Sequence, residues 1–228
     1  MLTQTQQNMI AQTIAFVKSG SAGESTGHDW WHIYRVEKLA LYLAEKEKAE
    51  LFLVRLAALL HDVDDWKFNA IGSAHAENWL KSLDVDAETI EKVVHIIAQV
   101  SYKGAGEDTM PDSIEARVVQ DADRLDALGA IGIARAFAYG GSKNREIYDP
   151  EVLPVMHADF EAYKTKVSHT INHFYEKLLL LKDRLHTSAA RELAEKRHAF
   201  MEEFLKNFFE EWNFEEDGRR KIEDRSRK

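Results

Sequence analysis

The stretch LFLVRLAALLHDVDDWKF, residues 51–68, changes from an apolar helical pattern to a cluster of ionisable side chains. Leu51, Val54 and Ala58 recur at three- and four-residue steps, as one face of an amphipathic helix requires. The ionisable residues that follow are His61, Asp62, Asp64, Asp65 and Lys67. Because burying polar groups without partners is costly, we expect a helix that ends beside a cation able to neutralise its acidic side chains.

The composition is that of a soluble protein with a large core. The chain has 228 residues, of which 45% are hydrophobic and 30% are charged, and its formal net charge is -9. Affinity for nucleic acid polymers comes chiefly from clustered Lys and Arg, so this charge argues against such a partner but permits a local basic pocket. The absence of cysteine from the sequence excludes disulfides, thiolate nucleophiles and Cys-type zinc sites.

The N-terminal segment, residues 1–20, lacks the basic start and long apolar core of a signal peptide. No apolar run reaches the ~18 residues of a membrane span, and the best one is interrupted by Arg55. We therefore expect a cytoplasmic protein with no membrane partner.

Helical periodicity extends over nearly the whole chain, and strand signals are nearly absent. Asp86 is expected to cap one helix, and Thr187 another. A long apolar stripe before Thr187 comprises Val167, Ile171, Phe174, Leu178, Leu181 and Leu185, and a second stripe after it comprises Leu193, Phe200, Phe204 and Phe208. The pattern predicts an all-α fold with a helical domain over 1–154, a two-helix extension over 155–213 and a charged, frayed tail over 214–228.

Three segments place His or Asp in helix-forming surroundings: GHDWWHIYRV (27–36), LLHDVDDWKF (59–68) and VVQDADRLDALGAIGIAR (118–135). In the first segment, His28, His32 and Arg35 share a helix face. In the second, His61 and Asp62 are neighbours about 100° apart around the axis, close enough to touch one ion.

The third segment offers carboxylates. Asp123 and Asp126 face the same side of a helix, whereas Asp121 points roughly the opposite way and is the weaker ligand candidate. Two imidazoles and two carboxylates suit a divalent ion such as Mn²⁺, Fe²⁺, Mg²⁺ or Ni²⁺ better than a closed tetrahedral zinc site.

The ordered set of an isolated His, a distant adjacent HD and a later Asp in an ADRL context resembles the HD superfamily of metal-dependent phosphohydrolases. The strings HDWWHIYRV, LLHDVDDWKF, SYKG, DADRLDALGAIGIAR and INHFYEKLLLLKDRLHT are similar to one bacterial branch, which includes a manganese-dependent nucleotide pyrophosphohydrolase of Bacillus. The resemblance covers about residues 25–210. It implies an HD-domain helical bundle with a C-terminal helical extension.

The resemblance implies metal ligands at His32, His61, Asp62 and Asp123. Asp126 then supports the site, although it remains the alternative for the fourth ligand. The resemblance also implies one divalent ion per chain, with Mn²⁺ first and Mg²⁺, Fe²⁺ or Ni²⁺ as alternatives, because the additional ordered His ligands of a two-metal site are not evident.

Other site roles also come from the resemblance or from helical spacing. An acidic residue at the position of Asp65 is associated in similar proteins with orienting the attacking water. Lys67, and Lys103 of SYKG as a second candidate, would neutralise phosphate oxygens. Further candidate substrate-binding residues are His28, His173 and Lys177.

Several of these features also have purely structural interpretations. Arg35 is expected to pair with Asp126 or Glu37, and His95 to be a packed histidine. The tryptophans expected in the core or the pocket wall are Trp30, Trp31, Trp66 and Trp79. Gly129 and Gly132 indicate a close helix–helix contact rather than a phosphate-binding loop.

The leading functional hypothesis is hydrolysis of a nucleoside triphosphate to the monophosphate and pyrophosphate. The alternatives are a nucleotide phosphatase or phosphodiesterase, a non-catalytic metal-stabilised ligand-binding module, and a two-iron oxygenase, which would need further ligands. The expected partner is a small phosphorylated substrate, and the sequence is compatible with a homodimer.

Overall fold

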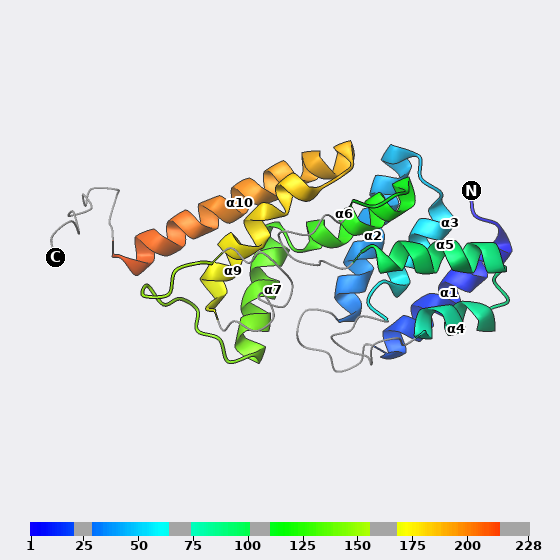
Figure 1. Cartoon of the computed structure of the whole chain (residues 1–228), viewed down its shortest axis with the longest axis horizontal. Helices are drawn as coiled ribbons and strands as arrows, with labels where there is room; N and C mark the ends of the chain where they lie inside the picture. Colours follow the sequence, from blue (N-terminus) through cyan, green and yellow to red (C-terminus); the bar gives the residue numbers. More distant parts are fainter. Residues whose placement is uncertain (21–28, 64–73, 101–109, 156–167, 215–228) are drawn as a thin grey trace.

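The computed structural model describes residues 1–20, 29–63, 74–100, 110–155 and 168–214. These ranges contain helices and connecting turns and no strand, which confirms the predicted all-α fold. The helices are α1 (Gln4–Gly20), α2 (Trp30–Glu47), α3 (Leu51–Leu60), α4 (His75–Ser82), α5 (Ala87–Ala98), α6 (Ile114–Asp126), α7 (Gly129–Ser142), α9 (Thr170–Glu176) and α10 (Ser188–Trp212). Two short 3₁₀ turns, η1 (Leu178–Leu180) and η2 (Lys182–Arg184), separate α9 from α10 (Figure 1).

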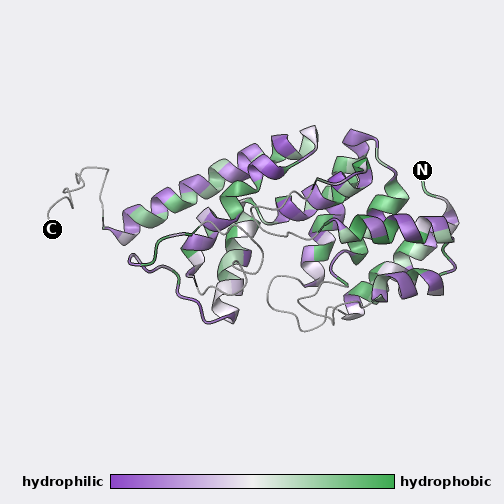
Figure 2. Cartoon of the chain, in the orientation of Figure 1, coloured by the Kyte–Doolittle hydropathy of each residue, from purple (hydrophilic) through white to green (hydrophobic). Residues whose placement is uncertain are grey.

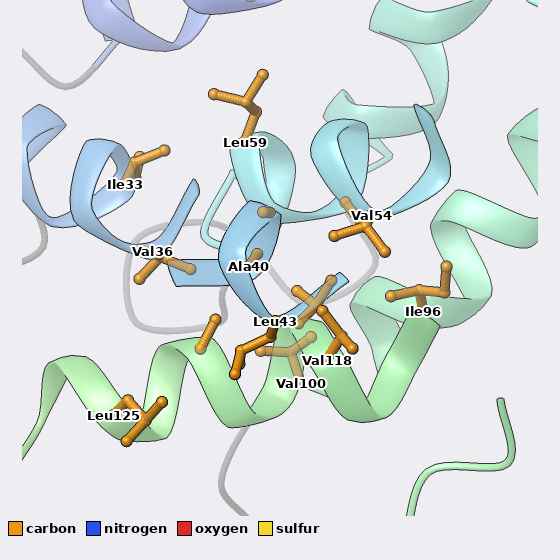
Figure 3. Close-up of a cluster of buried hydrophobic side chains, with 14 of the residues drawn as sticks. Ile33, Val36, Ala40, Leu43, Val54, Leu59, Ile96, Val100, Val118 and Leu125 are labelled. Carbon is orange, nitrogen blue, oxygen red and sulfur yellow. The ribbon is translucent and has the colours of Figure 1, made fainter. Parts of the chain in front are cut away.

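Helix α2 is the centre of the first half of the chain, where it packs against α3 and α6 (Figure 3). Val36, Ala40 and Leu43 of α2 are fully buried and are spaced by four and three residues, so they form the stripe that contacts both neighbours. Purple and green bands alternate along the helices in Figure 2, as expected where each helix turns one side to the core.

Helix α3 carries the buried run into the site. The Glu50 carboxylate caps its start by accepting hydrogen bonds from the amides of Phe52 and Leu53. Every residue from Leu56 to Leu60 is buried, and His61 follows as the C-cap. The apolar face therefore fixes the helix, and its end delivers His61 and Asp62 to the interior.

The start of α10 is anchored on α6 and α2. The buried Asp121 carboxylate of α6 accepts hydrogen bonds from the Thr187 amide (2.8 Å), the Thr187 hydroxyl (2.8 Å) and the His186 amide (3.0 Å). The Glu47 carboxylate at the end of α2 accepts from Ser188 Oγ and the Ala189 amide. Asp121 therefore ties the C-terminal helices to the first half of the protein, and the expectation that it points away from Asp123 fits this position.

Asp121→Ala is expected to lower the free energy of unfolding by about 3 kcal/mol, because it leaves buried donors of His186 and Thr187 without an acceptor. Urea denaturation of the metal-free protein measures this effect. Glu91→Ala, an exposed change within α5 and outside this network, is the control and should leave the midpoint nearly unchanged. Equal midpoints for the two variants would contradict the anchoring role.

Two expectations for the C-terminal helices were wrong. The stripe up to Leu185 does not belong to one helix, because the backbone leaves the helical region at Lys177 (φ -142°). Leu178, Leu181 and Leu185 are still buried, but from 3₁₀ turns, as the chain must turn back toward the anchor at Asp121. Phe200 is 53% exposed, because the buried side of α10 is formed by Ala190, Ala194, Met201 and Leu205.

Other expectations were confirmed. Asp86 caps α5 and Thr187 caps α10. Gly129 begins α7 with φ +72°, and a side chain there would meet Arg197 of α10 at 3.1 Å, so the close helix contact is real. A separate observation concerns membrane spans: no helix in the described part of the chain is both long and apolar enough to cross a membrane. The division at residue 154 stays a prediction, and the tail from residue 215 lies outside the described residues.

Candidate metal centre

Three helices bring four chemically active side chains together. His32 lies in the first turn of α2, fixed by Asp29, whose side chain caps the helix by accepting from the His32 amide at 3.0 Å. His61 and Asp62 follow α3, and Asp123 lies in the last turn of α6. Both imidazoles are buried, whereas the Asp123 side chain is 29% exposed and leaves the cluster accessible from one side.

The distances within this cluster suit a shared ion. His32 Nε2 lies 3.4 Å from Asp62 Oδ2 and 3.5 Å from Asp123 Oδ1. His61 Nε2 lies 3.4 Å from Asp62 Oδ1 and 3.8 Å from Asp123 Oδ1. Ligand atoms about 2.1 Å from one ion, at angles of roughly 90–110°, lie roughly 3.0–3.5 Å from one another. His32, His61 and Asp123 are therefore positioned to bind a divalent metal ion, and Asp62 lies between the two imidazoles.

The tautomer of His61 is set by a backbone carbonyl. Its Nδ1 lies 2.9 Å from Ala58 O, which can only accept, so Nδ1 carries the proton. In the neutral ring Nε2 then presents a lone pair toward the carboxylates. This buried atom forms no hydrogen bond within the described part of the chain. A buried polar atom normally has a partner, so its lone pair fits coordination of a cation.

His32 is held from behind by Asp126. Its Nδ1 donates to Asp126 Oδ2 at 2.7 Å, so Nε2 points into the cluster. Arg35 donates to both oxygens of the same carboxylate, at 2.7 and 3.0 Å, and Arg135 of α7 donates to Oδ2 at 3.0 Å. Both Asp126 oxygens are thus occupied by donors, which favours Asp123 over Asp126 as the fourth ligand.

The electrostatics of the cluster favour a cation. Burial and the Arg135 guanidinium lower the pKa of His32, but the hydrogen bond to Asp126 and the Asp62 carboxylate 3.4 Å from Nε2 raise it more, so the net pKa lies above its ordinary value. Burial alone would raise the pKa of Asp126, yet the hydrogen bonds from His32 and Arg35 hold it well below its usual range. Asp126 is therefore ionised and keeps the Nδ1–H tautomer of His32.

Asp126→Asn is expected to weaken metal binding by roughly 10- to 100-fold, because a carboxylate behind a ligating imidazole makes that imidazole a better donor. Isothermal titration with Mn²⁺ measures the change. Glu37→Gln is the matched control, since it disrupts the other carboxylate–guanidinium pair of α2, formed with Arg55 at 2.6 Å, without touching His32. The same loss of affinity in both variants would show a general effect on α2 instead.

Several predicted site residues lie outside the described residues. They are His28, Asp65, Lys67 and Lys103. Of the other candidates for substrate binding, His173 lies in α9 and Lys177 at its end, where α9 packs against α7. Their roles stay predictions.

Some structural interpretations were right and others wrong. Arg35 does pair with Asp126, while Glu37 pairs with Arg55. His95 is not packed but exposed, because the polar side of α5 carries it outward to Asp112 (2.6 Å). Trp31 is 58% exposed and so lies outside the core, since it lies about 100° around α2 from the buried His32. Trp66 lies outside the described residues, and a place of these tryptophans in the pocket wall stays a prediction.

Two elements of the site were missed in the sequence. Arg135 belongs to the centre through Asp126, nine residues earlier in the chain, and only the turn between α6 and α7 brings the two together. The Ala58 carbonyl orients His61 from the preceding turn of the helix. A His placed directly after a buried helical run could have predicted a hydrogen bond to a carbonyl of that helix. No feature of the sequence indicated that Arg135 would contact Asp126.

The comparisons with known proteins agree with this site. Residues 30–128 match the family model of the HD domain. The uncharacterized protein YpgQ of Bacillus subtilis is 43% identical over 199 residues, which cover 86% of this chain and 89% of YpgQ. The chain therefore belongs to the HD-domain family, as its motifs predicted.

Solved structures extend the similarity beyond the HD domain itself. A Lactobacillus plantarum protein superposes on this structure with a TM-score of 0.84 at 38% sequence identity. The match covers 94% of this chain and 100% of the Lactobacillus plantarum chain. An HD-superfamily hydrolase of Bacillus thuringiensis has a TM-score of 0.71 at 46% identity, with coverages of 91% and 98%. YpgQ in complex with ADP has a TM-score of 0.71 at 39% identity, with coverages of 89% and 97%.

Proposed function

We propose that this chain is a divalent-metal-dependent phosphohydrolase that cleaves a nucleoside triphosphate to the monophosphate and pyrophosphate. One observation carries the proposal: Nε2 of His61 and of His32 converge on the carboxylates of Asp62 and Asp123. Support comes from the relatives, because the Bacillus thuringiensis protein is described as a hydrolase and YpgQ was solved with ADP, a nucleotide.

In this proposal His32, His61, Asp62 and Asp123 hold one ion. Two ionised carboxylates and two neutral imidazoles leave a net charge of -2, which a divalent cation balances. The mixed nitrogen and oxygen set fits Mn²⁺ first, with Mg²⁺, Fe²⁺ or Ni²⁺ as alternatives. When bound, the ion supplies Lewis acidity, which acidifies water and neutralises charge on phosphoryl oxygens.

In the proposed reaction one bond to phosphorus forms and one breaks. The oxygen of water bonds to the α-phosphorus, the bond from that phosphorus to the bridging oxygen breaks, and pyrophosphate leaves with the electron pair. Asp65 is the proposed acceptor of the proton from the attacking water, and Lys67 and Lys103 are the proposed cations for phosphoryl oxygens. His28 is proposed to contact the substrate.

A matrix of nucleotides and added metal ions, with quantified products, tests this function. The expected result is Mn²⁺-dependent release of one pyrophosphate per nucleoside triphosphate. Orthophosphate as the first product would identify a phosphatase, and a metal-stabilised protein with no turnover would identify a binding module. Asp123→Asn, purified identically, controls for contaminating hydrolases because it keeps the shape of the side chain and removes the charge.

A further inference from the structure

Helix α10 reaches the end of α6 that carries Asp123 and Asp126. It packs against α2, α6 and α7, and Figure 1 shows it extending alongside α6 and α7. The match to the HD-domain model ends at residue 128, directly before α7 begins at Gly129, so both α7 and α10 lie beyond it. Support that α10 gives to the metal centre is therefore supplied by the C-terminal part of this chain.

Arg197 of α10 makes this contact. Its Nη1 donates to the carbonyl oxygen of Leu125, which lies between Asp123 and Asp126 in the last turn of α6. The last four carbonyls of a helix have no partner within it, and a cation beside them is favoured by the helix dipole. The Leu125 carbonyl also accepts from the Leu128 amide at 3.1 Å, so the backbone and Arg197 together close the end of α6.

The turn between α6 and α7 encloses the first part of the Arg197 side chain. Gly129 has φ +72°, and a Cβ atom there would lie 3.1 Å from Arg197 Cγ and 3.5 Å from Arg197 Cα. The backbone of α10 thus packs directly on this turn, which favours a residue without a side chain at position 129. The stem of Arg197 is therefore enclosed, and its guanidinium is held at the end of α6.

Arg197 also contributes charge beside Asp126. Burial lowers the pKa of Arg197, and the Asp126 carboxylate opposes this effect, so the two groups lie within electrostatic range of each other. Arg35 of α2 and Arg135 of α7 donate directly to the same carboxylate. Three helices therefore each direct a guanidinium toward the end of α6.

Asp123 is the proposed ligand whose position depends most on the backbone of α6. Its side chain is 29% exposed, against 12% for Asp62 and at most 2% for the two imidazoles. Its Oδ1 lies 3.5 Å from His32 Nε2 and 3.8 Å from His61 Nε2, whereas the Asp62 oxygens lie 3.4 Å from these atoms. Neighbouring side chains enclose Asp123 least, so the last turn of α6 must hold it in place.

We propose that Arg197 is a positioning residue of the metal centre, which holds the Leu125 carbonyl and thereby keeps Asp123 in place for the shared ion. This role rests on the proposed metal ligands and not on the proposed reaction. Helix α10 is then a part of the metal centre rather than a neighbouring extension.

Positioning and charge act on the metal in opposite directions. The positive charge of Arg197 repels a divalent cation, so its removal alone would strengthen binding. Loss of the hydrogen bond to Leu125 loosens the turn that carries Asp123, and this loss weakens binding. Arg197→Met removes both the charge and the hydrogen bond and keeps an apolar stem, so the sign of the change in affinity distinguishes the two effects.

Isothermal titration of the full-length protein with Mn²⁺ measures this sign. Arg197→Met is expected to weaken binding by about 3- to 30-fold, as is typical of residues that act on a site through an intervening element. Arg191→Met is the matched control, because Arg191 of the same helix also donates to a backbone carbonyl, that of Leu185 at 2.9 Å, which lies outside α6. The control should change the affinity less than about twofold. Unchanged or tighter binding by Arg197→Met, or equal weakening in both variants, would overturn the proposal.

The melting temperature of the metal-free variants separates positioning from folding. A purely structural role of Arg197 would lower the melting temperature of Arg197→Met and leave the Mn²⁺ affinity of the folded protein unchanged. Arg197→Lys keeps the charge but shortens the reach to Leu125, so its affinity should fall between those of the unaltered protein and Arg197→Met. If Arg197→Met unfolds, Arg197→Lys carries the test: affinity lower by at least about twofold supports positioning, and unchanged affinity overturns it.

The positioning role and the proposed function fail differently. Mn²⁺ binding that depends on Arg197, in a protein that hydrolyses no nucleotide, would refute the function and keep the positioning role. Nucleotide hydrolysis with equal Mn²⁺ affinity in Arg197→Met and the unaltered protein would keep the function and refute the positioning role. No binding of Mn²⁺ by the unaltered protein would refute both.

Discussion

Asp62→Ala is expected to reduce Mn²⁺-dependent nucleotide hydrolysis by at least about 1,000-fold and to abolish stoichiometric metal binding. The two oxygens of Asp62 each lie 3.4 Å from a different imidazole Nε2, so this side chain contacts both halves of the cluster. Its loss removes one of two proposed charged ligands, and the metal supplies several kcal/mol of the stabilisation of charge in the transition state. Turnover and metal content per chain, measured on the same sample, check both effects.

The stability of this variant separates catalysis from misfolding. In the metal-free state, Asp62→Ala should change the melting temperature only slightly, because the repulsion from Asp123 that it relieves offsets the attraction to the two imidazoles that it removes. In the presence of Mn²⁺ it should lose the rise in melting temperature that binding gives to the unaltered protein. Asp121→Ala should behave in the opposite way, with lower stability and intact metal binding. An Asp62→Ala protein that retains both metal and turnover would contradict the assignment.

Asp65→Ala has the second-largest expected effect, a loss of about 10²- to 10⁴-fold in kcat with metal binding retained. The reason is its proposed role as the acceptor of the proton from the attacking water, and a positioned base contributes roughly this factor. Measuring kcat beside metal content distinguishes the roles. Loss of the metal would mean that Asp65 is a ligand rather than a base, and full activity would exclude it from the reaction.

The helical fold could be predicted because local patterns and packing agree over most of the chain. Leu56 to Leu60 follow a helical apolar pattern and are buried, and Asp86 and Thr187 cap helices as their sequences indicate. The break at Lys177 could not be predicted, because leucines spaced for a helix are buried equally well from 3₁₀ turns when tertiary anchors fix the path of the chain. The apolar periodicity therefore predicts which side chains are buried, but it does not distinguish an α-helix from 3₁₀ turns.

Part of the candidate site could be predicted from the sequence. Its four proposed ligands stand in ordered motifs, so their sequence contexts predicted them as candidates, and the structure brings the four side chains together. Asp126 was ambiguous, because spacing gives it and Asp123 the same face of α6, and only the donors from α2 and α7 distinguish their roles. The prediction for His95 was wrong for a similar reason. This histidine has apolar neighbours in the sequence, but it lies on the polar side of α5, where it pairs with Asp112.

The most direct measurement is the anomalous scattering of Mn²⁺ in crystals of the full chain soaked with the ion. The account predicts one peak per chain, within coordination distance of Nε2 of His32 and His61 and of a carboxylate oxygen of both Asp62 and Asp123. A peak bound to Asp126 in place of Asp123, or an ordered ion away from this cluster with none inside it, would contradict the central claim.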